Sequence, residues 1–123
     1  MTSVLVVAIG GALGAIARYL LDGLIQERVH SAMPVGTLVI NVSGSLVLGV
    51  LVGLQLNHGL PATIELAGGT GFCGAFTTFS SLMYETIRLA QDGAHREATL
   101  TLSLNVVLGG IAAALGLLVT GAL

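Results

Sequence analysis

The chain has 123 residues, of which 54% are hydrophobic and only 8% are charged, so it carries more apolar surface than a globule of this size can bury. Its formal net charge is −2 and its four basic residues form no cluster, which excludes nucleic acid as an expected partner. With a single cysteine it forms no internal disulfide, and we predict one all-α membrane domain over residues 1–123.

The length of its apolar runs predicts four transmembrane helices. A helix needs roughly 20 apolar residues to cross the hydrocarbon core of a bilayer. Residues 3–24, 35–56 and 98–123 reach this length, and a more polar fourth candidate covers residues 62–90. The connections at 25–34, 57–61 and 91–97 are short, so successive helices should be antiparallel. The apolar run that follows Met1 is interpreted as the first membrane helix and not as a signal peptide.

Small residues in the first two spans indicate close helix packing. Gly10 and Gly14 are four residues apart in the first span, and Gly49 and Gly53 repeat this spacing in the second. Arg18 lies late in the first span, where we expect it to extend to the interface or pair with Asp22 one turn on. From there its charge would raise the concentration of anions at a pore mouth.

Two spans carry polar side chains on a single helical face. The spacing i, i+4, i+8 relates Thr37, Asn41 and Ser45 on the second span, and Thr101, Asn105 and Gly109 on the fourth. Polar groups at bilayer depth are costly unless they meet a partner, so such a face lines either a wet pathway or an interhelical contact. Two polar faces in one small protein favour the pathway.

The third span, at residues 62–90, combines four glycines between Gly68 and Gly74 with the hydroxyl residues that follow. We predict that its helix is interrupted near residues 71–77 and that a second subunit covers the break, because free backbone groups cannot face lipid. The freed carbonyls and amides could coordinate ions. The alternative is an unbroken, tightly packed helix whose hydroxyls bond to their own backbone.

Four segments give the chain a resemblance to the Fluc fluoride channels, also called the CrcB family, along nearly its whole length. They are residues 10–19 (GGALGAIARY), 36–44 (GTLVINVSG), 71–81 (GFCGAFTTFSS) and, more weakly, 105–110, and the third is highly specific. The resemblance implies an antiparallel, dual-topology homodimer of four-helix subunits with a broken third helix and two pores built from both subunits. It also implies a multi-pass protein of the bacterial cytoplasmic membrane.

The resemblance further implies roles for individual residues. A structural sodium ion at the dimer centre would be held by the backbone carbonyls of Gly74 and Thr77. Asn41 would be the pore amide, flanked by Phe79 and by the hydroxyls of Ser80 and Ser81; Thr37, Thr101 and Asn105 would complete the path. The family has a second phenylalanine where this chain has Leu82, a departure that puts the paired-aromatic part of the mechanism in question.

The expected function is passive export of cytoplasmic fluoride, with no enzyme activity, cofactor or energy source. Amide and hydroxyl donors and the electropositive edge of the Phe79 ring can replace the hydration shell of a small anion. Because none of them is a full positive charge, the anion can also leave.

Three alternatives remain open. A coupled dual-topology transporter needs a membrane-embedded acid in its first helix, which holds none before Asp22. A non-conducting assembly protein would use glycines and polar faces only for packing. Finally, Arg28 lies in the first loop, Arg88 and Arg96 flank the third, and Arg18 lies toward the same end of its helix. This bias favours one-way insertion and pairing with an oppositely biased paralogue.

Overall fold

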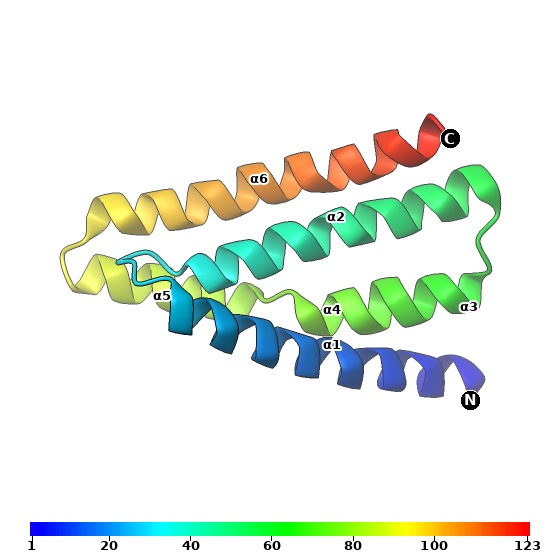
Figure 1. Cartoon of the computed structure of the whole chain (residues 1–123), viewed down its shortest axis with the longest axis horizontal. Helices are drawn as coiled ribbons and strands as arrows, with labels where there is room; N and C mark the ends of the chain where they lie inside the picture. The colour runs from blue at the N-terminus through cyan, green and yellow to red at the C-terminus, as the bar shows by residue number, and fades with distance from the viewer.

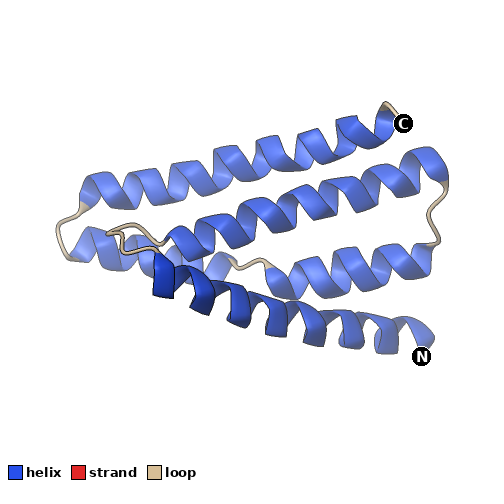
Figure 2. Cartoon of the chain, in the orientation of Figure 1, coloured by secondary structure: helices blue, strands red, loops and turns tan.

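The computed structural model describes residues 1–123 and is helical throughout, with no strand (Figure 2). The three long helices are α1 (Thr2–Arg28), α2 (Val35–His58) and α6 (His95–Gly121), and α2 lies between the other two in Figure 1. All three are long and apolar enough to cross a membrane, with mean hydropathies of 2.1, 2.1 and 2.2. These findings confirm an all-α chain and three of the expected spans.

The segment between α2 and α6 consists of several shorter helices. It runs through α3 (Ala62–Glu65), the π-helix η1 (Leu66–Cys73), α4 (Gly74–Phe76) and α5 (Phe79–Gln91). Only Thr77 and Thr78 leave the helical path, and Figure 2 draws them as a loop between α4 and α5. The helix is therefore interrupted near residues 71–77 as predicted, but only at the end of that range, at Thr77, and at the next residue, Thr78. The glycines stay helical because η1 satisfies its own amides with i→i+5 bonds.

Helices α1 and α6 depart most from their expected ends, and α2 ends at His58 and not at residue 56. Helix α1 continues to Arg28 because Gln26, Glu27 and Arg28 are good helix formers, which leaves only residues 29–34 as the first loop. Helix α6 begins at His95 and not at residue 98. None of these changes moves a residue of the expected pathway out of its helix.

The glycines of the two spaced pairs lie where helix backbones touch. A Cβ atom at Gly10 would collide with the carbonyl oxygen of Ala67, and one at Gly14 with that of Phe72, so α1 lies directly on η1. On the opposite side of the molecule, Gly49 lies against the carbonyl of Ala113 and joins α2 to α6. The predicted role of these glycines in close packing is thus confirmed.

The interior of the subunit is small. Its buried apolar side chains are few: Ile40, Cys73, Phe76, Leu82, Ala98 and Ala112. Large apolar side chains such as Ile9, Val106 and Leu118 are exposed along the outside of the helices. An outer surface of this kind needs lipid or another protein chain as its surroundings.

Candidate ion pathway

The site is centred on the break between α4 and α5. Thr77 (φ −71°, ψ 160°) and Thr78 (φ −147°, ψ 120°) both have extended backbone. The Thr77 N–H still donates to the Cys73 carbonyl at 3.0 Å. The Thr78 N–H instead donates to the side-chain oxygen of Asn41 at 2.8 Å. The regular helical bond from Thr78 to Gly74 is thereby lost, and α2 supplies the replacement.

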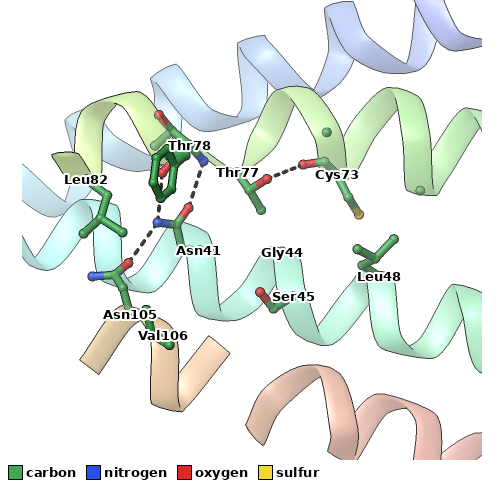
Figure 3. A pocket seen from close by; sticks show the side chains of 13 residues that line it. Asn41, Gly44, Ser45, Leu48, Cys73, Thr77, Thr78, Leu82, Asn105 and Val106 are labelled. Carbon is green, nitrogen blue, oxygen red and sulfur yellow. Dashed lines mark hydrogen bonds between the residues drawn. The ribbon is translucent and has the colours of Figure 1, made fainter. Parts of the chain in front are cut away.

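The Asn41 amide is fully used by contacts within the chain. Its Nδ2 donates to the Thr78 carbonyl at 3.0 Å and to Asn105 Oδ1 at 2.9 Å. Asn105 in turn donates from Nδ2 to the Thr101 carbonyl at 2.8 Å. Figure 3 shows Asn41 between Thr78 and Asn105, with dashed lines to both. The polar faces expected on the second and fourth spans therefore meet at one level of the bundle.

Three hydroxyl groups gather at the start of α5. Thr78 is the N-cap of this helix, and its Oγ1 accepts the Ser81 N–H at 3.2 Å. The same hydroxyl donates to Ser81 Oγ at 3.0 Å and lies 3.4 Å from Ser80 Oγ. The sequence analysis did not assign Thr78 a role of its own. A threonine directly before a helical run with periodic apolar residues is an N-cap signal that could have identified it.

An open cavity of about 350 Å³ lies on one side of Thr78. Its lining includes Asn41, Gly74, Thr77, Thr78, Phe79, Leu82 and Asn105. Ser45 and Leu48 extend it along α2 (Figure 3). Leu82 is buried, with 4% of its surface exposed, whereas the Phe79 side chain is 73% exposed at the open side of the subunit.

A second cavity of about 220 Å³ lies on the other side of Thr78. Its polar lining comprises Arg18, Asp22, Thr37, Ser81 and Glu85, in addition to Thr78 itself. Thr78 lines both cavities and so lies where they meet. The open cavity is lined by asparagine amides and Phe79, and the smaller cavity is lined by charged side chains. Asp22 and Glu85 were not among the residues expected at the site.

Arg18 does not pair with Asp22 as expected. Its Nη1 donates to the Thr77 carbonyl oxygen at 3.5 Å, which points the side chain inward to the break. Asp22 accepts a hydrogen bond from Gln26 Nε2 at 2.8 Å instead. The physical reason is that the unwound carbonyl of Thr77 needs a donor, and Arg18 is the donor that α1 offers at this level.

Four of the expected pathway residues do not line the open cavity. Thr37 and Ser81 line the charged cavity instead, so the face that Thr37 shares with Asn41 is divided between the two cavities. Thr101 lines neither cavity; it is 1% exposed and its hydroxyl has no partner. Ser80 is exposed and reaches the site only through its contact with Thr78.

The chain is similar to a known family over most of its length. Residues 5–117 match the family model described as "CrcB-like protein, Camphor Resistance (CrcB)". A relative from Leifsonia xyli subsp. xyli, named fluoride-specific ion channel FluC 1, is 52% identical over 98 residues, which cover 80% of this chain and 72% of the relative.

Two further relatives match nearly the whole chain. The protein named fluoride-specific ion channel FluC 1 from Nocardia farcinica is 45% identical over 94% of this chain and 80% of its own length. The protein named fluoride-specific ion channel FluC 2 from Moorella thermoacetica is 46% identical over 97% of each chain. The shared region includes both cavities and the break between them.

Proposed function

Since the chain belongs to the CrcB family and is a multi-pass membrane protein, we propose that it forms a fluoride-specific channel in which fluoride leaves the cytoplasm passively past Thr78. The observation that carries this proposal is the pair of cavities that share Thr78, each with polar side chains in its lining, within a bundle of helices of membrane length. A cofactor has no part in such a step, because the anion moves down its own gradient.

The chemistry of the lining suits a small, strongly hydrated anion. Thr78, Ser80 and Ser81 offer hydroxyl donors, and Phe79 offers the electropositive edge of its ring. Both amide protons of Asn41 are engaged, so an anion beside it would take the place of Thr78 or Asn105 as acceptor. Arg18 is the one full positive charge and lies at the charged cavity, where it attracts anions without trapping them in the pathway.

We propose that the segment from α3 to α5 is a fourth, broken span and that a second subunit covers it. Phe79 and Gly74 are both exposed beside the open cavity, at the level of the break. Interrupted backbone at membrane depth is tolerated only when protein surrounds it. An antiparallel homodimer with dual topology provides such a cover, and it turns the open cavity into a pore lined by both subunits.

A structural sodium ion fits the same surface. Loss of the bond from Thr78 to Gly74 leaves the Gly74 carbonyl without a helical amide, and the Gly74 backbone is exposed. The Thr77 carbonyl oxygen is a second possible ligand, because it accepts the hydrogen bond from Arg18 with only one of its two lone pairs. Carbonyl oxygens are ligands that suit a hard cation. Gly74 and Thr77 would hold the ion, which would supply positive charge between the subunits.

The three relatives described above come from bacteria, which supports a place in the bacterial cytoplasmic membrane. The runner-up function is a proton-coupled small transporter, because Asp22 and Glu85 give the charged cavity two carboxylates. A non-conducting assembly protein is the third candidate. Each predicts a different outcome when a concentration gradient is imposed across a membrane.

The test is fluoride efflux from liposomes that contain the purified protein, measured with a fluoride electrode. We expect efflux down the gradient without a proton gradient. Asn41→Asp should abolish it, because a carboxylate accepts hydrogen bonds but donates none in an anion path. A strict requirement for a proton gradient would favour the transporter, and absence of flux from folded protein would favour the assembly role.

A further inference from the structure

The break between α4 and α5 contains neither glycine nor proline, since it consists of Thr77 and Thr78. Both residues favour extended backbone only mildly, and the local support is the N-cap bond from the Ser81 N–H to Thr78 Oγ1, which leaves the Thr78 amide and carbonyl unpaired. An extended residue inside a helical bundle must also find partners for its amide and carbonyl. The structure points to a contact from another helix as the cause of the break.

Asn41 gives Thr78 the two hydrogen bonds that the helix no longer supplies. Its Oδ1 accepts the Thr78 N–H at 2.8 Å and its Nδ2 donates to the Thr78 carbonyl at 3.0 Å. We propose that the Asn41 amide is the clamp that holds the break open, and that Asn105 is a positioning residue that fixes the orientation of this amide. Together these residues decide where the third span is interrupted.

Residue chemistry explains why asparagine occupies this position. A side-chain amide has one acceptor and two donor protons, so it can pair with a peptide unit as another peptide would. Aspartate only accepts, so it cannot donate to the Thr78 carbonyl, and serine has a single proton, so it cannot donate to both Thr78 and Asn105. Because Asn41 is 37 positions before Thr78, the clamp acts only after α2 has packed against α4 and α5.

Asn105 determines which way the Asn41 amide faces. Its Oδ1 accepts the second proton of Asn41 Nδ2 at 2.9 Å, while its own Nδ2 is committed to the Thr101 carbonyl at 2.8 Å. If Asn41 were flipped, two acceptors would face each other at Asn105 and two donors at Thr78. Asn105 is 6% exposed, so water cannot readily replace either partner. The connection therefore runs from α6 through α2 to the break.

The test of the clamp is the rate of amide hydrogen exchange at Thr78, measured by NMR on the full chain in nanodiscs. We expect Asn41→Leu to accelerate exchange of the Thr78 amide by roughly tenfold or more, as for the loss of a buried hydrogen bond. Asn105→Leu should accelerate it less, and the double variant should match Asn41→Leu alone, because Asn105 acts through Asn41. Ser43→Ala, which removes a hydroxyl bonded only within α2, is the control and should leave Thr78 unchanged.

Asn105→Asp separates the clamp from conduction. Its carboxylate still accepts from Asn41, so Thr78 should keep near-parental exchange, whereas the new negative charge beside the pathway should lower fluoride flux. Only the flux part rests on the proposed function. Unchanged exchange of the Thr78 amide in Asn41→Leu would overturn the clamp. If Asn41→Leu does not fold, unchanged exchange of the Thr78 amide in Asn105→Leu would overturn it instead. Additive effects in the double variant, or fast exchange in Asn105→Asp, would overturn the positioning role.

Discussion

The guanidinium of Arg18 reaches from α1 to the helix break, with its Nη1 3.5 Å from the carbonyl oxygen of Thr77. The bond is long and therefore weak, so it orients the side chain and leaves the positive charge able to attract an anion. The same guanidinium lines the charged cavity with Thr78 and Ser81. Arg18 is therefore placed to attract an anion and to support the backbone that the anion would pass.

Replacement of Arg18 by glutamine should lower fluoride flux by roughly tenfold at low ionic strength, because the cavity loses its positive potential. Added inert salt should narrow the difference from the parent protein, since ions screen the charge. Arg28→Gln, at the exposed end of α1, is the matched control and should change flux little. A deficit that persists unchanged in high salt would assign Arg18 a purely structural role.

Phe79→Ile should reduce flux by roughly tenfold while the protein remains folded. The ring is 73% exposed within the subunit, so its loss costs little packing but removes an electropositive edge from the pathway. The measurement is liposome efflux together with thermal unfolding in detergent. Flux equal to that of the parent would show that the ring does not meet the anion.

Leu82→Phe should retain flux or raise it. Leu82 is buried, but it borders the open cavity of about 350 Å³, which can accept part of a larger ring. We expect overpacking to cost about 1 kcal/mol of stability. Efflux and the unfolding temperature should be measured on the same preparation, and loss of flux in stable protein would contradict the prediction.

Gly14→Ala should destabilise the subunit, whereas Gly23→Ala should not. A Cβ atom at Gly14 would collide with the backbone of Phe72, and the two helices would have to separate, at a cost of about 1–3 kcal/mol. Gly23 lies in the same helix with nothing within 4 Å of the added carbon, and alanine is the better helix former. Thermal unfolding of both variants in one detergent compares them directly. Equal unfolding temperatures would rule out close packing at Gly14.

Gly74→Leu should prevent dimer assembly without unfolding the subunit. A Cβ atom at Gly74 meets only the Gly69 carbonyl, at 4.0 Å, so the new side chain projects away from its own chain. A partner packed on this surface would be displaced. Light scattering of the detergent complex measures the change, and Gly110→Leu, on an open face of α6, is the control. A Gly74→Leu dimer as stable as the parent would move the interface elsewhere.

The arginine bias gives a prediction about membrane orientation. Arg28 ends α1, Arg88 and Arg96 flank the turn from α5 to α6, and Asn57 lies in the last turn of α2. Figure 1 shows the end of α1 and the turn from α5 to α6 on one side of the bundle, and the end of α2 on the other. A cysteine introduced at Asn57, with Cys73 removed, should be labelled from both sides of intact cells if the chain forms a dual-topology homodimer. Labelling only from outside would favour one-way insertion and an oppositely biased partner chain.

The sequence by itself determined the long helices and the way in which they pack. The apolar runs were long enough to identify α1, α2 and α6, because hydropathy is a property of each segment alone. The glycine pairs correctly indicated close contact, because a residue without a side chain allows close approach by any helix that packs against it. The resemblance carried by residues 71–81 led to the correct family.

Only the tertiary structure decided where the segment from α3 to α5 breaks and where Arg18 points. The glycines drew attention to residues 71–77, yet their backbone stays helical and the break falls on Thr77 and Thr78. That position depends on Asn41, which bonds to both backbone groups of Thr78 from another helix. A helix breaks where its hydrogen bonds find better partners, and such partners exist only once distant segments have packed together.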